Sequence, residues 1–214
     1  MTTPESETTM SESTTDPATA ADPAHTDPRE ALTGAVALVG EVIARTRPDQ
    51  SDLATPCPDY GVRDLCRHLV SVGRRVAVLG GGGDFHSVPH FAEDVADGQW
   101  SAAWDAAAGD ITTVWSDPAV LGREIALPWG PVPGAVAAVN HTTEFVLHAW
   151  DLAVATGQDP EWDPAVLAGP LAAMHRAVPA EPRTAPVPFG PVVPVPDDAP
   201  GIDRLVAWYG RRPR

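Results

Sequence analysis

Residues 140–157 read NHTTEFVLHAWDLAVATG, and this stretch predicts one long helix with potential ligands on one side. We expect the helix to run from about residue 134 to 156, with Gly157 as its C-terminal stop. At about 100° per residue, positions 144 and 148 differ by about 40°, and 141 lies within about 60° of either. His141, Glu144 and His148 therefore share one face of the helix.

Apolar residues recur at helical spacing in further segments and predict an all-α protein. The stripes cover residues 28–47, 62–79, 100–115 and 164–178, and a final helix covers 202–209. Three tryptophans share one face of the third stripe, which is usual for a core. Ile125, Leu127 and Trp129 alternate along a short segment, which predicts an irregular strand or an extended crossover. Four main helices with one short extended insert favour a helical bundle.

Composition limits the classes of partner. The length of 214 residues suits one globular domain with additional residues at its ends. Twenty-nine acidic and 14 basic residues leave a net charge of −15, which counts against nucleic-acid and anionic-membrane surfaces. Every basic residue is Arg, and the absence of Lys removes Schiff-base chemistry and the phosphate-binding lysine of a P-loop. We therefore expect neither a nucleic acid nor a membrane as partner, and the oligomeric state stays open.

The beginning of the chain differs from the remainder. Residues 1–27 are rich in Thr, Ser, Pro and acidic residues without an apolar period, which predicts a disordered acidic tail before a domain at 28–214. This region has no cationic start and no apolar run of signal-peptide length. Cys57 and Cys66 match neither a CxxC pair nor a cysteine-rich zinc site. A reduced, cytoplasmic setting is the simplest interpretation.

A third metal ligand is expected from another helix, because Glu144 and His148 alone do not make a tight site. His68 lies on the apolar stripe of the second helix and should point inward, where helix-bundle metal sites are built. The structural alternative is a hydrogen-bonded core histidine beside an ordinary Glu/His contact on a helix surface. His86 and His90 lie in a polar loop and need no such explanation.

Four blocks of the sequence resemble a known family. The blocks are TPCPDYGVRDLCRHLV (55–70), ALPWGPVPG (126–134), EFVLHAWDLAVATGQ (144–158) and FGPVVPVPDDAPGIDRLVAWYGR (189–211). In this order and spacing they resemble the DinB-like maleylpyruvate isomerase family of mycothiol-dependent enzymes, in particular its short actinobacterial members without an extra C-terminal domain. The resemblance covers about residues 28–214.

The resemblance implies a DinB/YfiT-like four-helix bundle with a divalent metal ion, usually Zn²⁺ with Ni²⁺ as the alternative, at one end of the core. The metal ligands of the family fall on His68, Glu144 and His148 of this chain. His141 has no counterpart in the family pattern, so we expect it to be a neighbour of the site. Tyr60 replaces the usual Trp and Gly61 the usual hydroxyl or acidic N-cap, which affects the pocket wall more than the metal.

Two neutral imidazoles and one carboxylate leave a zinc ion with an open position, as in catalytic centres. Our hypothesis is that the metal binds mycothiol or a similar thiol cosubstrate as a thiolate, which attacks an electrophilic carbon of a small substrate. The protein would then be an S-transferase or a thiol-assisted isomerase. The alternatives are a hydrolase that uses metal-bound water, and a non-catalytic module that binds a metal or a ligand.

Several neighbours of these residues have weaker predictions. Asp151 and Asp64 lie one turn from His148 and His68, and either orient the imidazoles or only cap helices and face solvent. Trp129 and Trp150 line the pocket or belong to the core. Cys57 and Cys66 are left out of the ligand set. Three arginines that follow His68 either bind carboxylates or polar groups of a substrate or thiol, or form a solvated helix face: Arg67, Arg74 and Arg75.

Overall fold

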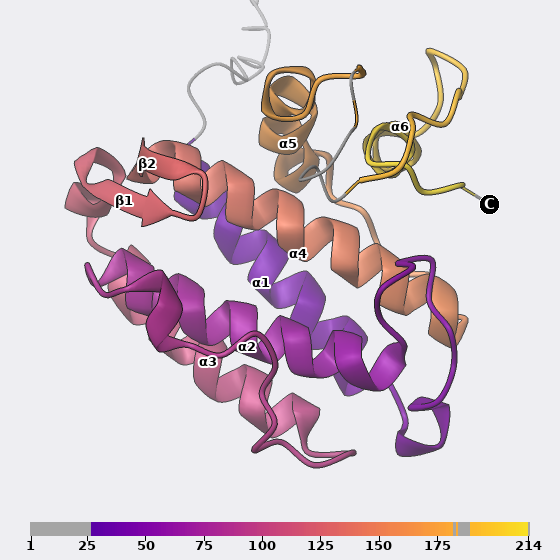
Figure 1. Cartoon of the computed structure of the whole chain (residues 1–214), viewed down its shortest axis with the longest axis horizontal. Coiled ribbons are helices and arrows are strands. Elements are labelled where there is room, and N and C mark those ends of the chain that lie inside the picture. The colour runs from indigo at the N-terminus through magenta and orange to yellow at the C-terminus, as the bar shows by residue number, and fades with distance from the viewer. Residues whose placement is uncertain (1–26, 182, 184–188, 214) are drawn as a thin grey trace, which may run out of the picture.

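The computed structural model describes residues 27–181, 183 and 189–213, so the predicted acidic tail at 1–27 lies almost entirely outside the described part. The main helices are α1 (Pro28–Ala44), α2 (Val62–Gly80), α3 (Trp100–Trp115) and α4 (Gly134–Thr156). They form a bundle in which α1 packs mainly on α4, and α2 on α3 (Figure 1). The fold is all-α apart from one small sheet, as the sequence predicts.

Shorter elements complete the structure. Single 3₁₀ turns η2 (Pro48–Gln50), η3 (Phe85–Ser87) and η4 (Pro118–Gly122) connect the helices. Helices α5 (Pro164–Ala177) and α6 (Gly201–Trp208) lie together beside α4, outside the four-helix core (Figure 1). Within the described residues every helix is too short or too polar to cross a membrane.

Local chemistry explains the helix ends. Asp27 and Asp163 accept hydrogen bonds from backbone N–H groups as N-caps of α1 and α5, each followed by a proline in the first turn. Helix α4 ends at Gly157, which adopts a left-handed conformation with φ of 72°. The first helix ends three residues before the predicted Arg47, because Arg47 precedes Pro48 and must be extended (φ −91°, ψ 151°).

The short insert is a β-hairpin rather than a single extended segment. Strand β1 (Glu124–Leu127) pairs antiparallel with β2 (Gly130–Pro133), and Leu127 lies opposite Gly130. Ile125 and Leu127 are buried, but Trp129 in the turn is 71 % exposed. The interpretation of Trp129 as a pocket or core residue is therefore wrong, because the chain reverses at this point and turns the indole to solvent.

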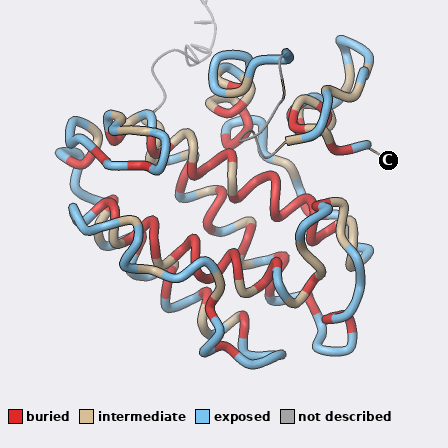
Figure 2. The backbone as a smooth tube through the Cα atoms, in the orientation of Figure 1, coloured by how far each residue is buried: buried red, intermediate tan, exposed pale blue. Residues whose placement is uncertain are grey.

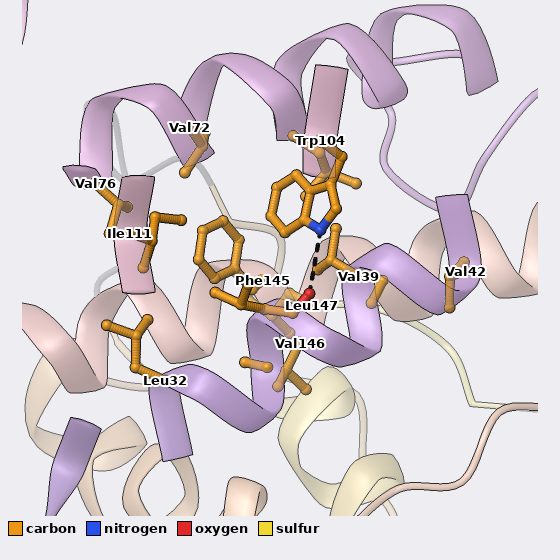
Figure 3. Close-up of a cluster of buried hydrophobic side chains, with 14 of the residues drawn as sticks. Leu32, Val39, Val42, Val72, Val76, Trp104, Ile111, Phe145, Val146 and Leu147 are labelled. Atoms are coloured by element: carbon orange, nitrogen blue, oxygen red, sulfur yellow. Dashed lines mark hydrogen bonds between the residues drawn. The ribbon is translucent and has the colours of Figure 1, made fainter. Parts of the chain in front are cut away.

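The core lies between the facing sides of the four main helices, where buried residues concentrate (Figure 2). The tryptophan stripe of α3 is part of this core, as predicted, since Trp100, Trp104 and Trp115 are all buried. Trp104 packs edge to face on Phe145, and its Nε1 donates to the Val36 carbonyl at 3.2 Å (Figure 3). These contacts link α3 to both α1 and α4, and so fix the frame that holds the candidate site.

Candidate metal centre

Two antiparallel helices, α2 and α4, carry the residues of the candidate centre. The C-terminal end of α2 and the first residue of α4 meet at Arg123. The Arg123 guanidinium donates to the Gly80 carbonyl at 3.0 Å, and the Gly134 N–H donates to the Arg123 carbonyl at 2.8 Å. Later positions on α2 therefore face earlier positions on α4. His68 lies near the start of α2 and so faces the second half of α4.

The structure brings His68, Glu144 and His148 together. Their nearest ligand atoms all lie within 4.8 Å of one another. Glu144 Oε1 is 3.1 Å from His68 Nε2 and 3.5 Å from His148 Nε2, so one carboxylate oxygen lies close to both imidazoles. Both imidazoles are buried, whereas the Glu144 side chain is 35 % exposed. The cluster can therefore be reached from solvent on the Glu144 side.

Asp151 and Arg211 hold His148 from behind. Asp151 is fully buried, and its Oδ2 accepts a hydrogen bond from His148 Nδ1 at 3.1 Å. The Arg211 guanidinium donates to the same carboxylate at 2.8 and 3.2 Å. With Nδ1 bound to Asp151, the Nε2 atom of His148 faces Glu144. Histidines that ligate a metal ion commonly donate their other ring N–H to a carboxylate in this way.

The electrostatics of the cluster follow from these contacts. Burial by itself would raise the pKa of Glu144, but His148 and His68 hold this pKa well below its usual range. Burial would lower the pKa of His148, but Glu144 and Asp151 outweigh it and raise this pKa to about 9. Without a metal ion, His148 is therefore a cation between two carboxylates near pH 7. A divalent cation bound here would replace that proton.

Tyr60, His90 and Phe91 form a wall beside the cluster. The Tyr60 ring lies 4.9 Å from the His68 ring and 6.0 Å from the His148 ring, and its hydroxyl is 2.7 Å from His90 Nε2. Burial raises the pKa of Tyr60 to about 12, so its hydroxyl stays protonated. Tyr60, which stands where the family usually has Trp, thus lies beside both imidazoles of the cluster.

Sequence reasoning missed Arg211, which binds Asp151, and also His90. The His90 ring lies 4.8 Å from the ring of His68, although 22 positions separate the two residues. No periodicity could have found it, because it lies in a loop that the sequence describes only as polar. The loop is positioned through α2: Ser71 donates a short hydrogen bond to the Pro89 carbonyl, and Arg75 donates to the same carbonyl at 2.8 Å.

Asp64, His141 and Trp150, the weaker candidates from the sequence, differ in burial and in their contacts. Asp64 is exposed, and His68 Nδ1 has no hydrogen-bond partner among the described residues, so only Asp151 orients an imidazole. His141 is a buried neighbour whose ring packs edge to face on Trp115 at 6.4 Å. Trp150 is buried in the core.

The three arginines after His68 differ from one another. Arg74 pairs with Asp94 at 2.8 Å and lies partly exposed, in accord with a solvated helix face. Arg67 is half-buried and donates to the Val95 carbonyl at 3.2 Å. Arg75 is only 6 % exposed, so the solvated interpretation is wrong for this residue, which points into the fold beneath the loop around Pro89.

Cys57 forms a second group of donor atoms with His148 and Asp151. This group is less suited to a metal ion, because both oxygens of Asp151 already bind the Arg211 guanidinium and a cation there would meet that charge. Burial also raises the pKa of the Cys57 thiol. Both cysteines are free.

Two surface hollows lie away from this cluster. One, of about 250 Å³, lies between α1 and α3 beside Arg29 and Trp115. The other, of about 300 Å³, lies between α1 and α5 beside Trp162. Among the described residues, those that line the hollows do not form a group of metal-ligating atoms within 4.8 Å of one another, so the donor atoms on α2 and α4 are the candidate site.

Comparison with known proteins finds a family and two relatives that match the segments carrying the cluster. The family described as the mycothiol maleylpyruvate isomerase N-terminal domain matches residues 32–153, which include both α2 and the ligand positions of α4. Two relatives from Mycobacterium tuberculosis, uncharacterized protein MT0763 of strain CDC 1551 and uncharacterized protein Rv0738 of strain H37Rv, are each 34 % identical over 188 residues. The alignment covers 88 % of this chain and the full length of each relative. No solved structure matches. The chain therefore belongs to the family of the mycothiol maleylpyruvate isomerase N-terminal domain.

Proposed function

We propose that the protein is a metal-dependent enzyme that uses a small thiol of the mycothiol type, as an S-transferase or a thiol-assisted isomerase acting on a small electrophile. One observation carries the proposal. Three donor side chains from two helices, His68, Glu144 and His148, converge within 4.8 Å at a place that solvent reaches. Membership of a family named for mycothiol supports the choice of thiol.

The donor set fits a zinc ion. Two imidazole nitrogens and one carboxylate oxygen are borderline and hard ligands that suit Zn²⁺, and three protein ligands leave a coordination position for another molecule. When bound, the ion would act as a Lewis acid that lowers the pKa of a coordinated thiol and makes it nucleophilic at neutral pH.

The residues of the chain would do the remaining work. Asp151 keeps the proton of His148 on Nδ1, so the Nε2 lone pair stays available for the ion. Arg211 fixes Asp151 in turn. Tyr60 and His90 present a hydroxyl and an imidazole beside the cluster, where they can orient the polar groups of a bound thiol or substrate. A cytoplasmic location is part of the proposal, because Cys57 and Cys66 are free thiols.

The first test is metal content. We expect about one zinc or nickel ion per chain in protein purified without chelator, and loss of this ion in His68→Ala and in His148→Ala. His86→Ala is the matched control, since His86 is exposed and outside the cluster. Stoichiometric metal in both ligand variants would contradict the assignment. If the wild-type protein is metal-free and takes up neither zinc nor nickel, the metal-dependent enzyme is contradicted and a non-catalytic module is favoured.

The second test separates thiol chemistry from hydrolysis. Cobalt-loaded protein is mixed with mycothiol, and the absorption band for charge transfer from a thiolate to cobalt is measured. The band should appear with mycothiol and not with its S-methyl derivative, which has no ionisable thiol. Absence of the band in a correctly loaded protein would refute the thiol assignment and favour water as the nucleophile.

A further inference from the structure

A line of polar side chains continues from the candidate metal centre into the interface between α2 and α4. His68, Ser71 and Arg75 follow one face of α2, and His148, Glu144 and His141 follow the facing side of α4. Spacings of three and four residues keep each set on one face of its helix. Because the helices are antiparallel, Arg75 and His141 both lie on the same side of the centre, deeper in the bundle. The centre does not account for these two residues.

Arg75 is a buried cation without a carboxylate partner. Its guanidinium donates to the Val88 and Pro89 carbonyls through one nitrogen, at 3.1 and 2.8 Å, while its Nε is buried without a hydrogen-bond partner in the described part of the chain. No acidic oxygen of a described residue lies within ion-pair distance of it. Burial lowers the pKa of Arg75, and the charge of Glu144, beyond ion-pair distance, offsets this only in part.

Most other arginines of α2 and the buried Arg211 pair with carboxylates, whereas the partly exposed Arg183, like Arg75, binds only backbone carbonyls. Arg63 and Arg74, on the same helix, each pair with aspartates of neighbouring loops, and the buried Arg211 pairs with Asp151. A buried charge without a partner is costly, and a buried arginine normally binds a carboxylate or phosphate. Arg75 is therefore a buried guanidinium with a donor left free by the described residues, as expected of a side chain that binds an anionic ligand.

His141 supplies a second unsatisfied group on the same side. It is 8 % exposed, and its Nε2 atom has no hydrogen-bond partner among the residues that the structure describes. Burial lowers the pKa of His141 to about 4, against the charge of Glu144, which raises it, and together with the charge of Arg75, which lowers it, so the ring is neutral and able to donate one N–H. Arg75 and Glu144 both act electrostatically on this ring, which places all three in one neighbourhood.

We propose that Arg75 and His141 form a subsite for a carboxylate group of the small-molecule substrate, next to the candidate metal centre. The inference rests on the proposed function, because the centre supplies the reaction for which the carboxylate positions the substrate. With a divalent cation bound, the charges of the cation, Glu144 and Arg75 sum to +2, in a chain whose net charge is −15. An anionic nucleophile and one carboxylate would balance this charge.

A purely structural role for Arg75 is the competing explanation. Its contacts with Val88 and Pro89, and its position 4.6 Å over the Phe85 ring, hold the loop that carries His90. Neutral carbonyl oxygens and an aromatic ring do not compensate a buried charge as a carboxylate does. Ser71 also binds the Pro89 carbonyl, so the loop keeps one attachment when Arg75 turns to a ligand.

The test measures the binding of succinate by calorimetry at constant ionic strength, on zinc-loaded and on metal-free full-length protein. Succinamide, which has a similar shape and no charge, is the control ligand. Wild type should bind succinate and not succinamide. Arg75→Met should weaken binding by at least about tenfold, since it removes a charge-assisted pair. Arg74→Met, on the same helix but exposed, should leave the affinity within about twofold. Circular dichroism checks folding, and His141→Phe, expected to weaken binding as well, provides the second variant.

The outcomes separate the two proposals. Succinate binding that depends on Arg75 in a protein that takes up no metal would support the subsite and contradict the proposed function. Zinc binding at His68, Glu144 and His148 without any succinate binding would overturn the subsite alone. Equal affinity of Arg75→Met and wild type would also overturn it, whatever the metal content.

Discussion

Replacement of Asp151 by Asn should weaken both the fold and metal binding at the proposed centre. The carboxylate is fully buried and accepts hydrogen bonds from His148 Nδ1 at 3.1 Å and from the Arg211 guanidinium at 2.8 and 3.2 Å. An amide of the same shape removes the charge and places an NH₂ group against at least one donor. Arg211, itself buried, then keeps its charge without a partner.

The structure sets the size of both effects. Removal of one partner from a buried ion pair costs about 3 to 5 kcal/mol of unfolding free energy, which is a large part of the roughly 5 to 15 kcal/mol of a typical domain. Loss of the group behind a ligating histidine lowers metal affinity by about 10- to 100-fold. Urea unfolding of metal-free protein measures the first effect, and zinc titration against a competing chelator measures the second.

Asp64→Asn is the matched control, because Asp64 stands one turn from His68 as Asp151 stands one turn from His148. It is exposed, so its replacement should change the unfolding free energy by less than about 0.5 kcal/mol and leave zinc affinity unaltered. Addition of Arg211→Met to Asp151→Asn should recover part of the lost stability, since the unpaired charge is gone. A loss below about 1 kcal/mol in Asp151→Asn, or strict additivity in the double variant, would refute the reasoning.

Three further predictions concern stability and the free thiols. Burial lowers the pKa of His141 to about 4 in the folded protein, whereas the pKa is about 6.5 in the unfolded chain. The stability that depends on the neutral His141 ring is therefore complete above about pH 6.5 and is lost as the pH falls toward 4. His141→Phe should remove up to about 3 kcal/mol of this acid dependence in urea unfolding at pH 4.5 and 7, and equal pH profiles would contradict the burial argument. Gly109→Ala, in the exposed interior of α3, should stabilise by about 0.5 to 1 kcal/mol, whereas Gly134→Ala should destabilise by about 3 kcal/mol because its Cβ would overlap the Val120 carbonyl oxygen. Cys57→Ser should keep the full metal content by elemental mass spectrometry, and loss of the ion would instead make Cys57 a ligand.

The sequence predicts the helices well because their signals are local. A period of 3.6 residues and terminal residues such as Gly157 are properties of short segments, and α4 runs over the predicted residues 134–156. The clustering of Glu144 and His148 is local in the same sense, because one turn of helix separates them. The metal assignment itself stays a prediction, since donor atoms in proximity do not identify an ion.

Contacts between distant segments are only partly predictable. His68 meets Glu144 across 76 positions, and the apolar stripe of α2 indicates only that His68 points inward. This inward position makes His68 the best candidate for the third ligand, and the family resemblance implies the same residue. The place of His90 beside His68 depends on hydrogen bonds between α2 and loop carbonyls, for which side-chain patterns give no signal.

The buried polar positions carry the functional information. On α2, the stripe of Leu65, Leu69, Val72 and Val76 would pack a bundle fully if apolar residues also stood at 68, 71 and 75. Buried charges such as Arg75 add little to stability and often cost it, and well-packed apolar residues in their place are frequently neutral or stabilising. Stability therefore does not explain why the facing sides of α2 and α4 carry imidazoles, a carboxylate and a guanidinium. The proposed metal ion and substrate carboxylate would together use all of these groups at one interface between the two helices.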